Sequence, residues 1–128
     1  MPTRTRKPRP KRPRYDPALL RMALDVAIRD VGLPEPRKEY QFARKQLKRQ
    51  WRLDLSWPEL RIAVEIEGGI HMRGRHIRPA GFIADMEKYN RLALWGWVLI
   101  RTTYDMIADG VTIQLIEEAF AYRRAEAA

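Results

Sequence analysis

Two short runs of the sequence alternate apolar and polar residues, which is the pattern of half-buried β-strands. The first run covers residues 51–57, the second covers 62–67, and a Pro-Glu dipeptide at 58–59 lies between them. Proline is found at strand edges and in turns, so we expect a hairpin with the dipeptide as its loop. In that register Trp57 pairs with Leu60.

The alternation divides the side chains of this hairpin between two faces, because successive residues of a strand point in opposite directions. The expected register places Asp54 opposite Ala63 and one diagonal step from Glu65. A slip by one residue would turn the carboxylates into the core, so the pattern resists it. The acidic face carries Arg52, Asp54, Ser56, Ala63, Glu65 and Glu67, and the apolar face carries Leu53, Leu55, Trp57, Ile62, Val64 and Ile66.

The rest of the chain reads as helices and strands around this hairpin. Asp16 and Pro17 are typical of a helix start, and Gly32 is typical of a helix end. The predicted order is α-β-β-β-α-β-α, an α/β (α+β) fold with a C-terminal helix. The elements beside the hairpin are a first helix ending at 32, a strand at 39–42, a helix at 82–95, a strand at 97–103 and a last helix from 113 to about 124.

The composition fits one folded domain. The chain has 128 residues, 45% of them apolar, which is enough for a sizeable core. It has no cysteine, so disulfides and Cys-bound zinc are excluded. No apolar run is long enough to span a membrane, and no signal-peptide segment follows the basic N-terminus. We therefore expect a cytoplasmic protein of bacterial or phage origin, without a membrane partner.

The formal charge of +9 is concentrated at the N-terminus. Residues 1–14 hold seven Lys or Arg, four prolines and no acid, and the remainder has 18 basic against 16 acidic residues. We expect a disordered basic tail over 1–15, before a single domain over 16–128. Such a tail is suited to sequence-independent contacts with phosphates, through Arg12 and Arg14 among others. The alternative is a solubility tail or a targeting patch.

Three carboxylates on one face of a hairpin repel one another, and a divalent cation held against a phosphate would offset that repulsion. Mg²⁺ prefers oxygen ligands and keeps several waters. Asp54 and Glu65 can supply two oxygens and the Ile66 carbonyl a third, so that the metal activates water at a phosphodiester. The alternative is that the acids are ordinary surface residues in ion pairs. Their partners would then be Arg52, Arg61 and Arg101.

Basic residues follow the acidic face in sequence and are suited to holding a DNA backbone. The segment 70–81 reads as an irregular basic loop, and 44–49 reads as a solvated basic turn. Within the loop, His76 is a further candidate for the site. The four tryptophans, by contrast, are more typical of core packing than of base stacking. The candidate phosphate contacts are Arg73, Arg75 and Arg78 in the loop, and Arg44, Lys45 and Lys48 in the turn.

The ordered combination of these motifs, from Leu33 to Thr103, resembles the PD-(D/E)XK nuclease superfamily. The likeness is strongest to small phage-borne and very-short-patch-repair-like endonucleases. It implies a restriction-endonuclease-like αβββαβ core with a mixed sheet flanked by helices. It also implies Mg²⁺-dependent DNA cleavage, with Mn²⁺ as a substitute, and Asp54 and Glu65 as metal ligands. The matching strings are WRLDLSWP at 51–58, AVEIEGG at 63–69, GRH at 74–76, DMEKYN at 85–90 and the segment 96–101.

The sequence departs from the superfamily pattern at two places. Glu67 stands where the motif has a lysine, and some members of the superfamily recruit a lysine from the next helix instead. By position Lys88 is the candidate. The first acid of the pattern has three competitors, of which Glu39 is slightly favoured over Asp25 and Asp30. The candidate catalytic residues are therefore Asp54, Glu65, Glu67, Lys88, His76 and Glu39.

Three functions compete. The first is a metal-dependent DNA endonuclease that recognises a structure such as a junction, a nick or a mismatch. A Holliday junction resolvase of this kind would act as a symmetric homodimer, because it makes paired cuts. The second is a non-catalytic DNA-binding protein that retains a relic of the site. The third is a restriction-like or toxin nuclease, although the sequence shows no separate domain for reading DNA sequence.

Overall fold

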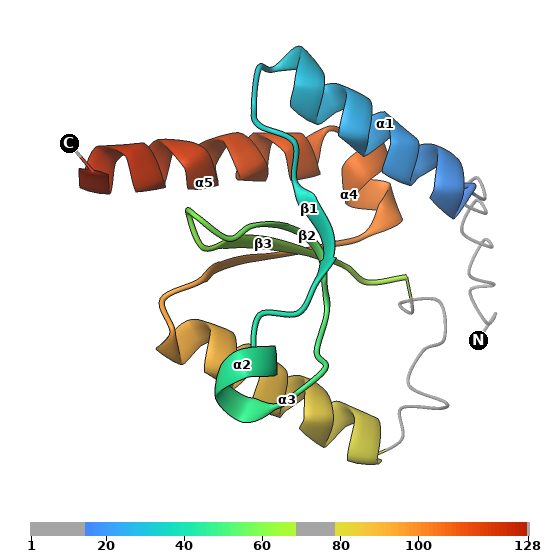
Figure 1. Cartoon of the computed structure of the whole chain (residues 1–128). Helices are drawn as coiled ribbons and strands as arrows, with labels where there is room; N and C mark the ends of the chain where they lie inside the picture. Colours follow the sequence, from blue (N-terminus) through green and yellow to red (C-terminus); the bar gives the residue numbers. More distant parts are fainter. Residues whose placement is uncertain (1–14, 69–78, 128) are drawn as a thin grey trace, which may run out of the picture.

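Four strands form one mixed sheet in the order β1-β2-β3-β4 in the computed structural model, which describes residues 15–68 and 79–127. The first three strands pair antiparallel, and β4 lies parallel to β3. The expected α+β class, with a mixed sheet flanked by helices and a helix at the C-terminal end, is confirmed (Figure 1). The strands are β1 (Arg37–Tyr40), β2 (Leu53–Trp57), β3 (Ile62–Ile66) and β4 (Val98–Thr102).

Helices cover both faces of the sheet (Figure 1). One face packs against α1, α4 and α5, and the other lies under α2 and α3. No helix in the described part of the chain is long and apolar enough to cross a membrane. The helices are α1 (Pro17–Asp30), α2 (Arg44–Leu47), α3 (Pro79–Leu94), α4 (Tyr104–Ala108) and α5 (Val111–Ala127).

The first helix begins and ends where the sequence predicted. The Asp16 carboxylate accepts a hydrogen bond from the Ala18 backbone N–H at 2.9 Å, and Pro17 occupies the first turn. This cap satisfies a donor that has no partner within the helix. Gly32 has a φ of 76°, so the chain leaves the helix through a conformation that glycine adopts without strain.

Several predicted boundaries were wrong. β1 lies at Arg37–Tyr40 rather than at 39–42, because Phe42 leaves the strand and is buried against the sheet. The predicted basic turn contains the short helix α2, and α3 begins at Pro79, inside the predicted loop. Helix α4 was not predicted, because it is too short to show periodicity. It has an N-cap in which the Thr103 side-chain oxygen accepts a hydrogen bond from the Met106 N–H.

The hairpin register differs from the prediction by two residues. Trp57 pairs with Ile62 rather than with Leu60, because the turn is longer than two residues. Leu60 N–H donates to the Trp57 carbonyl at 3.0 Å, and Arg61 has a φ of 51°. An even shift does not by itself exchange the two faces of the hairpin. Continued by one more residue, the observed register places Asp54 opposite Glu65 instead of Ala63.

The apolar face of the hairpin packs against α1, α4 and α5 in the larger core. Trp57 and Phe120 meet edge to face with ring centroids 5.0 Å apart, an arrangement that aromatic pairs prefer. Both side chains are almost completely buried. The other members of this core are Leu24, Ile28, Leu55, Ile62, Val64, Ile66, Ile100, Ile107, Ile116 and Ala119.

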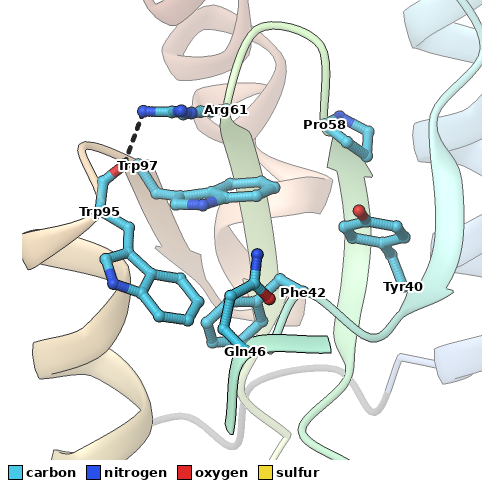
Figure 2. A pocket seen from close by; sticks show the side chains of 7 residues that line it. All are labelled: Tyr40, Phe42, Gln46, Pro58, Arg61, Trp95 and Trp97. Carbon is cyan, nitrogen blue, oxygen red and sulfur yellow. Dashed lines mark hydrogen bonds between the residues drawn. The ribbon is translucent and has the colours of Figure 1, made fainter. Parts of the chain in front are cut away.

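A second core lies on the acidic face, so this face is covered along much of its length. Ala63 and Leu92 are buried there beside Phe42, and several aromatic side chains surround them (Figure 2). Leu53 also packs here, although the alternation predicted it on the opposite face with Leu55. Leu53 pairs with Tyr40 of β1. The residue before Tyr40, Glu39, has a φ of 55°, which interrupts the extended backbone of the strand.

Candidate functional site

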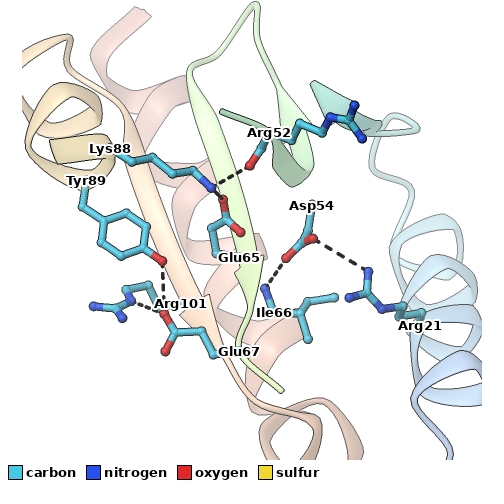
Figure 3. A network of polar contacts seen from close by, with 9 residues as sticks. All are labelled: Arg21, Arg52, Asp54, Glu65, Ile66, Glu67, Lys88, Tyr89 and Arg101. Carbon is cyan, nitrogen blue, oxygen red and sulfur yellow. Dashed lines mark hydrogen bonds and ion pairs between the residues drawn. The ribbon is translucent and has the colours of Figure 1, made fainter. Parts of the chain in front are cut away.

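Asp54 and Glu65 meet where β2 and β3 run side by side (Figure 3). The Asp54 Oδ2 atom accepts a hydrogen bond from the Ile66 backbone N–H at 2.7 Å, which fixes the direction of this carboxylate. The Asp54 side chain retains 20% exposure, whereas that of Glu65 retains 10%. The pair therefore sits at an edge of the buried region, with Asp54 closer to solvent.

Lys88 reaches this pair from α3. Its Nζ atom donates to Glu65 Oε1 at 2.5 Å and to the Arg52 carbonyl oxygen at 2.6 Å (Figure 3). Leu92, one helical turn further on, is fully buried in the second core. Residues four apart share a face of a helix, so the anchored leucine directs the lysine toward the sheet.

Burial dominates the electrostatics of Glu65. It raises the pKa of this carboxyl group from an ordinary 4.5 to about 7, although the hydrogen bond and charge of Lys88 act in the opposite direction. The nearby Asp54 carboxylate raises the pKa of Glu65 further, through its charge and a hydrogen bond. Two neighbouring carboxyl groups favour a shared proton or a bound cation.

Arg21 of α1 lies on the outer side of Asp54, with Nη1 3.9 Å from Oδ1. A hydrogen bond with Tyr104 is the main cause that raises the pKa of Arg21, and the charges of Asp54 and Glu39 add to it. Glu39, favoured by sequence as the first acid of the pattern, is therefore within electrostatic range of Arg21 at the rim of the site. Of its competitors, Asp25 is engaged with Lys38 at 2.7 Å.

Glu67 points away from Lys88 and toward β4 (Figure 3). Its carboxylate accepts hydrogen bonds from Arg101 and, at 3.4 Å, from the Tyr89 hydroxyl. The Arg101 guanidinium also lies over the Tyr89 ring, 4.5 Å from its centroid. Burial and the charges of Glu65 and Glu67 raise the pKa of Tyr89 to about 12. Glu67 thus has the ion-pair partner that the alternative interpretation predicted for it.

The cationic candidates divide into two groups. On α2 and at its end, Arg44, Lys45 and Lys48 are exposed to solvent. The other candidates fall outside the residues that the structure describes. These are Arg12, Arg14, Arg73, Arg75, His76 and Arg78.

The donor set near Asp54 fits a cation only in part. Among residues 15–68 and 79–127, no three His, Asp or Glu side chains are grouped so that they could hold a metal ion. Asp54 and Glu65 offer two hard oxygen donors, and the Ile66 carbonyl is the predicted third. Such a partial set is compatible with Mg²⁺ only because this ion takes few protein ligands and completes its shell with waters and substrate oxygens.

Sequence reasoning missed two residues of the site. Arg21 lies on a helix far from the hairpin in sequence, and no spacing rule connects it to Asp54. Tyr89 was not among the candidates, although its position beside Lys88 on a helix that borders the acidic face was a usable signal. Both residues place further polar groups around the carboxylates.

Comparison with known proteins adds relatives without a known activity. No protein-family model and no solved structure matches the chain. Two relatives in Mycobacterium tuberculosis, "Uncharacterized protein Rv2248" of strain H37Rv and "Uncharacterized protein MT2308" of strain CDC 1551, are each 32% identical over 76 residues. The match covers 59% of this chain and 26% of each relative, so the chain spans about a quarter of their length.

The raised pKa of Glu65 predicts how stability changes with pH. The folded protein binds the Glu65 proton more tightly than the unfolded chain, so this residue's contribution is fully favourable below about pH 4.5 and is lost as the pH rises to about 7. The loss is at most about 3 kcal/mol. Glu65→Gln should remove this dependence, so that the variant gains stability relative to wild type between pH 5 and pH 8.

Urea unfolding of the metal-free protein at both pH values measures this difference. Glu87→Gln is a suitable control, because Glu87 is an exposed acid on α3 that pairs with Arg49 at 3.4 Å. Equal pH dependence of wild type and Glu65→Gln would contradict the prediction.

Proposed function

We propose that this protein is a metal-dependent DNA endonuclease that hydrolyses phosphodiester bonds. The observation that carries the proposal is the ion pair between Lys88 and Glu65, beside Asp54. The resemblance to PD-(D/E)XK nucleases implied two acidic metal ligands and a lysine supplied from the next helix. The three side chains lie together, although they come from three elements of the fold.

The burial of Glu65 supports a catalytic use of the acids over a purely structural one. A carboxylate that is 8% exposed and next to a second acid destabilises the fold in its charged form. A protein that only binds DNA gains nothing from such a pair facing the phosphates. A bound divalent cation would remove this repulsion and give the arrangement a use.

Each residue of the site then has a defined task. Asp54 and Glu65 bind the metal, and the Ile66 N–H holds the Asp54 carboxylate in place. Lys88 orients Glu65, and its ammonium group offers a positive charge where the attacking water and a scissile phosphate would meet. When bound, Mg²⁺ supplies Lewis acidity toward the phosphate oxygen and lowers the pKa of a bound water.

DNA is the proposed partner because Arg21 and Lys88 contact the acidic pair and further basic residues lie elsewhere in the chain. The exposed lysines and arginine of α2 lie on the same face of the sheet as α3 (Figure 1). The basic residues of 1–14 and of 70–78 add charge on either side in sequence. We propose a structured substrate, such as a junction, a nick or a mismatch, and a homodimer if the substrate is a four-way junction.

A cleavage assay tests the proposal. Duplex, nicked, mismatched and four-way-junction DNA are incubated with the protein and Mg²⁺, Mn²⁺ or EDTA. Asp54→Asn and Glu65→Gln should each lower the cleavage rate at least about 100-fold. Residues that only support a metal ligand typically cost about 10- to 100-fold when they are changed, so the expected effect is at or above that range. Lys88→Met should also lower the rate at saturating DNA, whereas Glu87→Gln should not.

A negative cleavage assay would contradict the proposal. If wild type binds these DNAs tightly but cleaves none of them with either metal, the endonuclease proposal fails. The non-catalytic DNA-binding function would then be the better interpretation.

The basic tail gives a separate prediction. Residues 1–14 carry seven Lys or Arg, and each phosphate neutralised on duplex DNA contributes about 0.9 to the slope of log K against log salt. Deleting this segment should therefore weaken DNA binding and reduce the slope by up to about 6. The cleavage rate at saturating DNA should stay the same. An unchanged slope in a fluorescence-anisotropy titration would show that the tail does not contact DNA.

A further inference from the structure

A cavity of about 430 Å³ lies on the α2 and α3 side of the sheet, near the β2–β3 turn (Figure 2). It is separate from the carboxylate pair, which lies toward the other end of β3. Four aromatic side chains and two polar ones line most of it, from β1, α2, the hairpin turn and the end of α3. These residues are Tyr40, Phe42, Gln46, Arg61, Trp95 and Trp97.

The sheet next to the aromatic rings carries small side chains, among them Ala63 of the second core. Ser56 and Ala63 are paired across β2 and β3, and directly opposite residues share a face of the sheet. Both are fully buried. Tyr40 comes from the edge strand β1 and Trp97 from the residue just before β4, and their rings approach each other over the sheet. Their centroids are 6.4 Å apart with an angle of 36° between the planes.

The rings that line the cavity are only half buried. Tyr40, Trp95 and Trp97 keep part of their surface in contact with solvent, in contrast to Trp57, which is 3% exposed. The prediction that the tryptophans are core residues therefore holds fully for Trp57 alone. Phe42, at 6% exposure, closes the inner side of the cavity. Half-exposed aromatic rings around a hollow are suited to stacking against another planar ring.

Two polar side chains give the cavity hydrogen-bonding groups. Arg61 Nη1 donates to the Trp95 carbonyl at 3.0 Å, which holds the guanidinium at the rim (Figure 2). Gln46 projects from α2 over the opening and carries both donors and an acceptor. A ligand with a flat ring and polar atoms at its edge would match both the rings and these groups.

We propose that this cavity binds the base of an unpaired nucleotide in a DNA strand. A cavity of this size is within the usual range for a small-molecule ligand. The exposed cations of α2 are next to Gln46 in sequence, and Arg37 lies over the Tyr40 ring at 5.8 Å, so positive charge is available for the phosphates. The assignment of the ligand to a DNA strand, and not to a free nucleotide, rests on the proposed DNA function.

The position of the cavity links it to the carboxylate pair. Ala63 belongs to the core against which Tyr40, Trp95 and Trp97 pack, and Glu65 lies two residues further along β3, a separation of roughly 7 Å along the strand. Residues two apart point to the same face. An unpaired nucleotide held in the cavity would therefore place the adjoining backbone near the site, which explains how a structured substrate is selected over an intact duplex.

Binding of fluorescent DNA tests this inference without any cleavage. Asp54→Asn protein in EDTA is titrated into a single-stranded oligonucleotide that contains 2-aminopurine, into the matching duplex, and into the free 2-aminopurine nucleotide. Stacking should quench the fluorescence of the single strand and leave that of the duplex nearly unchanged. Because stacking on one aromatic contributes about 1–3 kcal/mol, Trp97→Ala should weaken this binding at least about fivefold.

Matched variants keep the result interpretable. Trp97→Phe retains a ring and should preserve binding, whereas Gln46→Ala changes an exposed residue and should weaken it while leaving thermal unfolding unchanged. Tyr122→Ala removes an exposed ring from α5, across the sheet, and should have no effect. Unchanged affinity in both Trp97→Ala and Gln46→Ala would overturn the inference. Equally tight, Trp97-dependent binding of the free nucleotide would overturn its assignment to a DNA strand.

The two proposals fail separately. Metal-dependent cleavage that is indifferent to Trp97 and Gln46 would contradict only the base-binding cavity. Binding that depends on these residues in a protein that never cleaves DNA would contradict only the endonuclease function.

Discussion

The neighbouring carboxylates of Asp54 and Glu65, on β2 and β3, are the constraint on which the site depends. Two adjacent acids, of which Glu65 is buried, are both charged only at a high free-energy cost unless a cation is near. Lys88 supplies one positive charge to Glu65, yet the pKa of Glu65 remains raised to about 7, so the compensation is incomplete. The surrounding fold holds this unfavourable arrangement in place, which is typical of functional sites.

The second core is what brings the lysine to the acids. The crossover from β3 to the parallel strand β4 runs through α3, and Leu92 fixes that helix against Ala63 and the aromatic residues. With the helix held there, Lys88 extends over Glu65, and position 67 is left to pair with Arg101 of β4. In the proposed nuclease site, Lys88 would supply from α3 the positive charge that the superfamily pattern places at position 67.

Much of the fold could be predicted from the sequence because its signals are local. The alternation in β2 and β3 and the Asp16 cap each follow from neighbouring residues. The predicted hairpin register was wrong because Arg61 adopts a left-handed conformation and the turn is longer than expected. The pattern of apolar residues does not encode this conformation. The pairing of Asp54 with Arg21 and the aromatic cavity were not predicted. They depend on contacts between residues far apart in sequence, for which the chain carries no spacing signal.

The most direct test is the binding of Mn²⁺ to the protein. Binding is measured as the loss of the electron paramagnetic resonance signal of the free ion. Wild type should bind Mn²⁺ at a site that is lost in both Asp54→Asn and Glu65→Gln, and retained in the control variant Glu87→Gln. Binding should strengthen as the pH rises through 7, because the proton on Glu65 competes with the metal. Equal Mn²⁺ binding by wild type and both site variants would contradict the proposed metal site.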